Sequence, residues 1–449
     1  MNDHYTTLYD TFGWWIPGRF SLAQACCYRW VENAADAQRI ALYAVDPEGR
    51  LDTWSYDRLA RTVSRLANGL TRMGIVRGDR VALVLGQRPE SLAALLAVNS
   101  VGAIAVPLSC QLGPDALEQR LRHAEARLAI IDSEGGENLL RIQHRCPSLS
   151  LILAIDMINE HVMSWRTLLA RQEEHFTPLP MLPSDPALLL YPQGPAAGRR
   201  PRGLLYAQVS LIGSLPGFVA AHDWFPQPGD VLWTQSDWSL GTTLLNTLLP
   251  VLYFGRSLAA TAGRLTAWRL QALLDQLPLT CLSFPAAAFE HLRETWAGME
   301  IRPAHLRNLV VTGRTPPSGL SAHCQTLFGI PANFVYQHPS EAVSLIGESA
   351  SQWPSRPGSL GRAYPGHRIR LAHPDPAMAG NSSNTGTLEI SRTDRYGHPD
   401  PALALGYWRD PTLTLHQPIA PWLSSEEWLH MDEAGYLWPA ADNTPSVPT

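Results

Sequence analysis

Charged residues are scarce in this chain. They make up 17% of the 449 residues, and 35 basic and 40 acidic side chains leave a formal net charge of −5. Nucleic acids and anionic membranes are bound through an excess of positive charge, so we expect neither a nucleic-acid partner nor a polybasic membrane anchor. Hydrophobic residues make up 45%, which is typical of a globular protein, and the length favours two or three subdomains.

Paired cysteine motifs are also missing. The six cysteines include no Cys-x-x-Cys pair and no His/Cys spacing of a zinc site; they are Cys26, Cys27, Cys110, Cys146, Cys281 and Cys324. The first ten residues, MNDHYTTLYD, lack the basic start and apolar run of a signal peptide. We therefore expect a cytoplasmic protein with reduced thiols.

A membrane-spanning run is not expected either. The most apolar stretch, 91–110, reaches the length of roughly 20 residues that a span requires. Asn99, Ser100 and Gly102 interrupt it, and a strand-like segment follows. A buried helix that leads into a buried strand is the better prediction.

The remaining pattern predicts an α/β fold. Apolar residues at helical spacing predict helices over 22–32, 57–73 and 114–124, and a further helix from Pro89. Continuous apolar strands lie between them and recur after a variable stretch at 134–184, which is typical of parallel sheets covered by helices. We predict two similar α/β subdomains, 1–184 and 185–354, a smaller β-rich subdomain, 355–440, and a disordered tail, 441–449.

Several segments, in this order, resemble the AMP-forming acyl-CoA synthetases, also called adenylate-forming enzymes. They are WSYDRLARTVSRLANGL, GIVRGDRVALVL, VGAIAVPL, PGDVLWTQSDWSLG, PGSLGRAYPGH, TGTLEI and LGYWRDPTLT. The resemblance implies a protein that joins ATP and a carboxylic acid into an acyl-adenylate, which a CoA or pantetheine thiol then attacks. It also implies ATP and Mg²⁺ as cofactors if the nucleotide site works, and an acyl carrier protein or another biosynthetic protein as a possible partner.

The segment that resembles the family's phosphate loop is altered. Residues 191–203 keep glycines at Gly194, Gly198 and Gly203, but the Ser and Thr hydroxyls of the motif are missing, and Arg202 stands at the lysine position. The resemblance leaves two interpretations open. Arg202 could still bind phosphate, because a guanidinium binds phosphate with two hydrogen bonds, or the loop could be a solvated basic surface segment.

The other nucleotide motifs are altered too. Tyr336, Ser340 and Glu341 resemble the family's Tyr-Gly-x-Thr-Glu motif, which implies a nucleotide contact and a weak Mg²⁺ ligand at Glu341; the alternative is an ordinary exposed glutamate. Gly313 matches the adenine side of the family's site, or only a strand end. The Thr-Gly-Asp aspartate that binds ribose has no counterpart before Asp432, and neither the family's hinge nor its small lysine-bearing domain is expected after it.

The acid-binding wall matches the family better. Trp233, Asp237, Trp238 and Gly241 match a segment that precedes the helix of the acyl pocket, although tryptophan here could also be core. Two functions follow. The first is a synthetase-like large domain that is impaired in adenylation and serves as an acyl-binding or partner-binding subunit. The alternative is an active ATP-dependent acid:CoA or carrier-protein ligase, with the small domain supplied in trans.

Overall fold

A computed structural model describes residues 3–192, 201–261, 263, 265–295, 305–338, 341–372, 384–409 and 421–440. Three sheets organise these residues. The largest has the strand order β16-β15-β14-β13-β12-β10-β11-β1-β2 in the described part of the chain. Its strands are β16 Arg362–Ala363, β15 Ile346–Gly347, β14 Asn333–Tyr336, β13 Asn308–Gly313, β12 Cys281–Pro285, β10 Val231–Thr234, β11 Ser257–Thr261, β1 Ile40–Val45 and β2 Leu51–Ser55.

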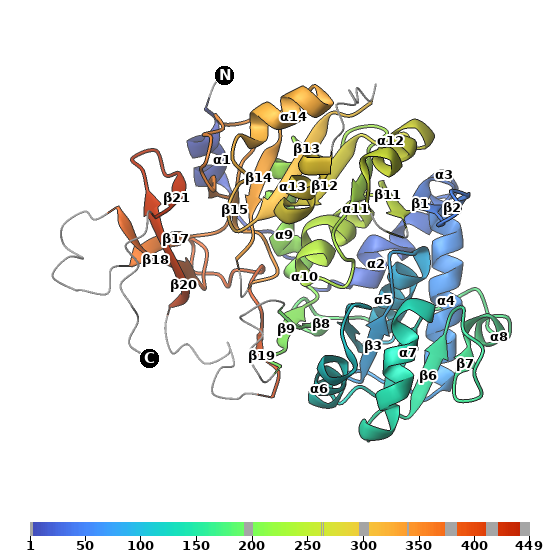
Figure 1. Cartoon of the computed structure of the whole chain (residues 1–449). Coiled ribbons are helices and arrows are strands. Elements are labelled where there is room, and N and C mark those ends of the chain that lie inside the picture. Colours follow the sequence, from blue (N-terminus) through green and yellow to red (C-terminus); the bar gives the residue numbers. More distant parts are fainter. Residues whose placement is uncertain are drawn as a thin grey trace.

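The second sheet has the order β19-β9-β8-β4-β3-β5-β6-β7 within the described ranges. Its strands are β19 Gly406–Tyr407, β9 Leu204–Ala207, β8 Pro186–Leu190, β4 Ile104–Pro107, β3 Arg80–Val84, β5 Leu128–Ile131, β6 Leu151–Ala154 and β7 Met163–Ser164. The third sheet, β17 Ile369–Ala372, β18 Thr385–Ser391, β20 Trp422–Met431 and β21 Leu437–Pro439, is antiparallel. It lies to one side of the molecule (Figure 1).

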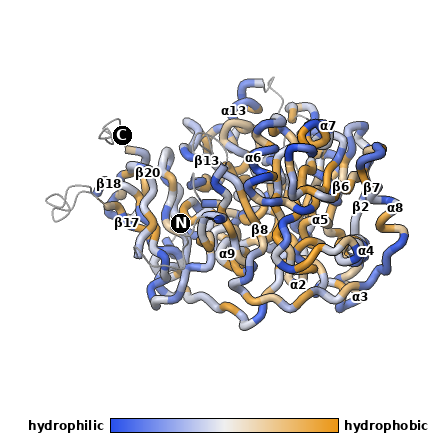
Figure 2. The backbone as a smooth tube through the Cα atoms, turned by 90° about the horizontal axis from the view of Figure 1, so that it is seen from below, coloured by the Kyte–Doolittle hydropathy of each residue, from blue (hydrophilic) through white to orange (hydrophobic). Residues whose placement is uncertain are grey.

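Helices fill the space between the two larger sheets. The helix α4, Tyr56–Arg72, contacts β1 and β2, and α5, Pro89–Ser100, contacts α4, β3 and β4. The arrangement confirms the predicted α/β class with largely parallel sheets. Figure 2 shows the hydrophobic segments gathered inside this body. Within the described residues, no helix has the length and apolarity that a membrane crossing requires.

The described residues form further α-helices, some inside the body and some on its surface. They are α1 Tyr5–Thr11, α2 Leu22–Cys26, α3 Ala34–Ala37, α6 Pro114–Ala124, α7 Ser133–Ile142, α8 Trp165–Leu169, α9 Ser210–Ala221, α10 Gly241–Thr243, α11 Leu249–Tyr253, α12 Ala267–Gln276, α13 Ala286–Thr295 and α14 Leu320–Phe328. A π-helical stretch, η4 Leu244–Leu248, joins α10 to α11. Such π segments occur often at functional sites.

Two predicted elements differ from the structure. The helix over 22–32 ends at Cys26, because Cys27 has a non-helical backbone (φ −137°, ψ −70°), and a short 3₁₀ turn follows at Tyr28–Val31. The stretch 134–184 is not merely variable. Its strands β6 and β7 continue the second sheet, and most of α7 and all of α8 also lie within it. The predicted tail, 441–449, lies outside the described residues.

The sheets exchange strands between the predicted sequence ranges. The hairpin of β1 and β2 belongs to range 1–184 but joins the large sheet through a parallel pairing with β11. In return, β8 and β9 of range 185–354 extend the second sheet, with β19 of range 355–440 at its edge. The division into 1–184, 185–354 and 355–440 therefore stays a prediction about folding units, not about sheet membership.

Candidate functional site

The segment predicted to bind phosphate leads into β9. Gly194 and Gly198 lie outside the described residues, whereas Arg202 and Gly203 come directly before β9. A Cβ atom on Gly203 would lie 2.7 Å from Leu189 Cδ1, so this glycine lets the β8–β9 hairpin pack closely. Arg202 is exposed and lines an open cleft together with Tyr407, Trp408 and Arg409.

Glu341 lies against the strand that this loop enters. The Tyr206 hydroxyl of β9 donates to Glu341 Oε2 at 3.0 Å and accepts the N–H of Ala342 at 2.8 Å. Burial raises the pKa of Glu341 to about 7, even though the hydrogen bond from Tyr206 opposes the shift. The carboxyl is therefore held in place beside the loop, and it carries a proton part of the time near neutral pH. Its predicted neighbour Ser340 lies outside the described residues.

Tyr336 ends β14 and is almost fully buried. Its hydroxyl has no hydrogen-bond partner among the described residues. Burial raises its pKa, and the charge of Glu427 adds to the shift. The N–H of the next residue, Gln337, donates to the carbonyl of Gly313 at 2.8 Å. The structure thus brings the predicted residues Gly313 and Tyr336 together at the ends of neighbouring parallel strands.

An ion pair lies beside these strand ends. Arg314, directly after Gly313, pairs with Glu427 of β20. Asp432, which directly follows β20, has its carboxylate bound within the turn after that strand. Its Oδ1 accepts the N–H groups of Ala434 (3.0 Å) and Tyr436 (2.9 Å), and its Oδ2 pairs with Arg356. Glu427 and Asp432 therefore already hold partners.

The four residues predicted for the acid-binding wall have structural contacts. Trp233 is 1% exposed and donates to the Thr261 hydroxyl at 3.0 Å, so it belongs to the core. Asp237 accepts from the Ser109 hydroxyl (2.6 Å) and from the N–H of Ser239 (2.8 Å), which fixes the turn before α10.

Trp238 and Gly241 complete that wall on its apolar side. Trp238 lines a small apolar cavity with Leu83, Leu92 and Leu244. A Cβ atom on Gly241 would lie 2.5 Å from Leu190 Cδ1, so the glycine permits close packing against β8. None of the four residues lines the polar cavity that lies next to them. As substrate contacts they stay a prediction.

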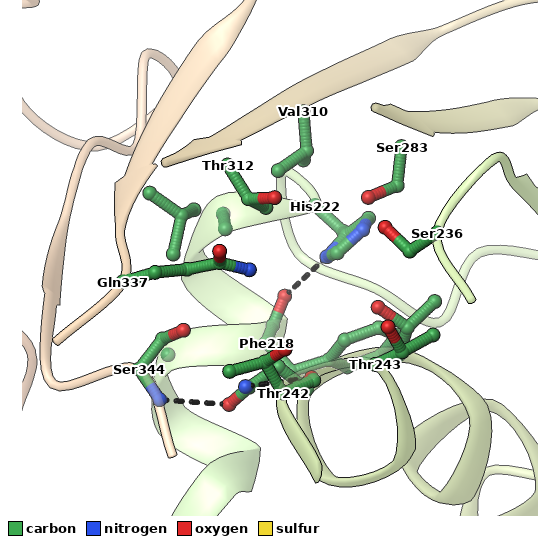
Figure 3. A pocket seen from close by; sticks show the side chains of 15 residues that line it. Phe218, His222, Ser236, Thr242, Thr243, Ser283, Val310, Thr312, Gln337 and Ser344 are labelled. Carbon is green, nitrogen blue, oxygen red and sulfur yellow. Dashed lines mark hydrogen bonds between the residues drawn. The ribbon is translucent and has the colours of Figure 1, made fainter. Parts of the chain in front are cut away.

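That polar cavity lies among β10, β12, β13, β14, α9 and η4 (Figure 3). Its free volume is small, about 20 Å³, which is room for about one water molecule. Its lining residues are Gly217, Phe218, Ala221, His222, Ser236, Thr242, Thr243, Asn246, Thr247, Ser283, Val310, Thr312, Val335, Gln337 and Ser344. Ten of these fifteen residues carry a hydroxyl, amide or imidazole group, and the described lining includes no Asp, Glu, Lys or Arg.

One wall of the cavity is fixed by Asn246. Its side-chain amide donates to the carbonyls of Thr242 (2.8 Å) and Ala342 (2.6 Å), and its Oδ1 accepts the N–H of Ser344 (2.8 Å). These bonds tie η4 to the chain that directly follows Glu341. The cavity and the carboxyl of Glu341 therefore share one rigid segment.

Sequence reasoning missed most of this cavity. The signal was present in two buried strands, CLSFP and NLVVTG, in which Ser283 and Thr312 are hydroxyl residues among apolar ones. His222 had no motif around it. Within the described residues, no cluster of His, Cys, Asp or Glu could hold a metal ion, so Glu341 would need phosphate oxygens and water to complete a Mg²⁺ site.

Comparisons with known proteins bear on the family and the fold of this chain. The model of the family described as "AMP-binding enzyme" matches residues 29–408. The uncharacterised acyl-CoA ligase YtcI of Bacillus subtilis is 23% identical over 90% of this chain and 74% of its own length. The 3-hydroxybenzoate/4-hydroxybenzoate–CoA ligase of Thauera aromatica is 24% identical over 86% of this chain and 71% of its own length.

Other matches are shorter. Acetyl-coenzyme A synthetase 1 of Debaryomyces hansenii is 27% identical over 52% of this chain, and the match spans only 37% of that enzyme. Among solved structures, an acyl-CoA synthetase of Brucella canis superposes with a TM-score of 0.84 over 99% of this chain and 80% of its own. Its identity is 21%, so this likeness establishes the shared fold.

Proposed function

Because the chain belongs to the AMP-binding enzyme family, we propose that it binds a small polar carboxylic acid and adenylates it slowly, as an acyl-binding subunit. The observation that carries the proposal is the cavity beside Glu341, which is lined with neutral polar groups. A long fatty chain there would leave hydroxyl and amide groups without hydrogen bonds, which is costly. The polar end of a short or ring-shaped acid suits this lining better, because the free space takes about one water-sized group.

The contacts of the carboxylates near the predicted nucleotide residues support slow adenylation. Arg314 stands beside Gly313 and pairs with Glu427, while Asp432 is occupied by the turn after β20. Asp432 is therefore unavailable to ribose unless these contacts break, and Glu427 already pairs with Arg314 through one carboxylate oxygen. The residues do offer Mg²⁺ one ligand at Glu341, and bound Mg²⁺ would supply positive charge against phosphate oxygens.

A second candidate is an active ligase with CoA or a carrier-protein pantetheine as the thiol acceptor. The observation that favours it is the Tyr206–Glu341 hydrogen bond, which holds the candidate metal ligand beside the phosphate segment. The small domain would then come from another polypeptide or from further residues of the same protein. A carrier-protein partner belongs to this candidate as well.

Acid-dependent exchange of pyrophosphate into ATP separates the two. We expect acids to bind in calorimetry while exchange stays slow, and Glu341→Gln to weaken Mg²⁺·ATP binding without weakening acid binding. Rapid exchange at micromolar acid would replace the first candidate with the second. A chain that binds no carboxylic acid would contradict both.

A further inference from the structure

One imidazole in the polar cavity has an unused acceptor. His222 directly follows α9 and is 2% exposed. Its Nδ1 lies 2.9 Å from the carbonyl oxygen of Phe218, so in the neutral ring Nδ1 carries the hydrogen and donates it. Nε2 is then a lone-pair acceptor. It is buried, and no described residue donates a hydrogen bond to it.

The surroundings keep this ring neutral. Arg307 donates to the backbone carbonyl of His222 at 3.0 Å and so brings a positive charge close to the ring. Burial, with Arg307 adding to it, lowers the pKa of His222 to about 4. At neutral pH, Nε2 therefore accepts a hydrogen bond and does not donate one.

The ring faces a cavity that has room for a ligand's polar group. Figure 3 shows His222 next to Ser236 and Ser283, with Thr312 and Gln337 across the cavity. A buried acceptor that finds no donor loses the hydrogen bond it would make in water and is destabilising. A ligand that brings an O–H or N–H to this point removes that cost, whereas an analogue with a C–H there leaves it in place.

The charge of the cavity lining also restricts which acids can bind. The described residues of the cavity wall include no carboxylate that could pair with an ammonium group. A free amino acid would bury its positive charge without a partner, which is strongly unfavourable. The donor that fits is a hydroxyl or an uncharged aromatic amine.

We propose that His222 is a specificity-determining residue, and that its Nε2 selects carboxylic acids that carry a hydroxyl or an uncharged aromatic amine. This inference rests on the proposed acid binding in the same cavity. It adds which acids are bound, and through which atom.

Two substitutions test the role of His222 Nε2 directly. His222→Asn can keep a donor for the Phe218 carbonyl but loses the acceptor at the Nε2 position. His222→Gln can place an amide oxygen near that position. Circular dichroism and the unfolding midpoint establish that each variant is folded before binding is measured.

Calorimetry on the full chain would use matched acids: 4-hydroxybenzoate with benzoate, and 3-hydroxypropanoate with propanoate and β-alanine. For the pair that fits, we expect the wild-type chain to bind the hydroxy acid at least about tenfold more tightly than the deoxy acid. β-Alanine should bind more weakly than 3-hydroxypropanoate. His222→Asn should reduce the hydroxy preference to about one, with the deoxy acid bound as before, and His222→Gln should restore part of the preference.

The outcomes distinguish a failure of the proposed acid binding from a failure of the proposed role of His222. If the wild-type chain binds no acid of either set, the proposed function fails and this inference fails with it. If acids bind with no hydroxy preference, or if folded His222→Asn keeps the full preference, acid binding stands and the role of His222 is overturned.

Discussion

The ion pair between Arg307 and Asp230 allows a change in the free energy of unfolding to be predicted. The guanidinium donates to both oxygens of Asp230, from Nε at 2.8 Å and from Nη2 at 2.5 Å. The Asp230 side chain is 1% exposed and that of Arg307 is 26% exposed. Arg307 also donates to the carbonyls of His222 and Asp223. One side chain therefore joins the end of α9 to the start of β10.

We expect Arg307→Gln to lower the free energy of unfolding by about 3 kcal/mol. Removing one partner of a buried ion pair costs about 3–5 kcal/mol, because the remaining charge is left without compensation in the interior. Asp230 keeps hydrogen bonds from the Thr280 hydroxyl (2.9 Å) and the N–H of Gln227 (2.7 Å). These bonds place the cost at the lower end of the range.

Urea unfolding, followed by tryptophan fluorescence and far-UV circular dichroism, measures the change. The matched control is Arg395→Gln, which removes an exposed pair with Asp10 whose side chains are 41% and 52% exposed. It should cost less than about 1 kcal/mol. The double variant Asp230→Asn/Arg307→Gln should be less destabilised than the sum of the single variants. Equal losses for Arg307→Gln and Arg395→Gln would refute the argument from buried charge.

Three further perturbations follow from the structure. Burial raises the pKa of Glu341 to about 7. The protonated carboxyl therefore contributes fully to stability below about pH 4.5, and this contribution is lost as the pH rises through 7. Urea titrations at several pH values should show that the Glu341→Gln variant does not lose stability over this pH range. Because burial lowers the pKa of His222 to about 4, the wild-type chain should lose stability as the pH falls from 6.5 towards 4, by up to about 3 kcal/mol, and His222→Gln should not show this loss. A Cβ atom on Gly213 would lie 2.3 Å from the backbone nitrogen of Ala402, so Gly213→Ala should lower the melting temperature by several degrees, whereas Gly18→Ala, with nothing within 4 Å, should leave it nearly unchanged.

Local sequence patterns predicted the elements better than their assembly. The helix α4 was evident from its one-sided apolar spacing. In the structure, the Ser55 hydroxyl accepts the N–H of Arg58 and begins the helix. The sequence also indicates the hairpin of β1 and β2, because the turn residues Pro47-Glu48-Gly49 separate two short strands. Its pairing with β11, more than 200 residues further along the chain, was not evident, because an apolar strand fits many parallel partners equally well. Sheet membership is decided by tertiary packing.

The same division holds for the candidate site. Glu341, Gly313 and Tyr336 were found because a motif places them in a known order, and the structure brings them to neighbouring strand ends and to β9. His222 lies in an apolar helix terminus with no motif, so only its three-dimensional surroundings reveal it. Trp238 and Leu244 line one small apolar cavity, and the role of Trp238 as an acid contact stays a prediction.

The unsatisfied groups of the polar cavity connect its stability to its function. His222 Nε2 and Ser344 Oγ are both buried, and neither has a hydrogen-bond partner among the described residues. Space for about one water molecule lies beside them. A buried polar group is stabilised when a water molecule or a ligand supplies its missing hydrogen bond. An acid that satisfies them should therefore raise the unfolding midpoint as its concentration increases, and this stabilisation should be smaller in His222→Asn.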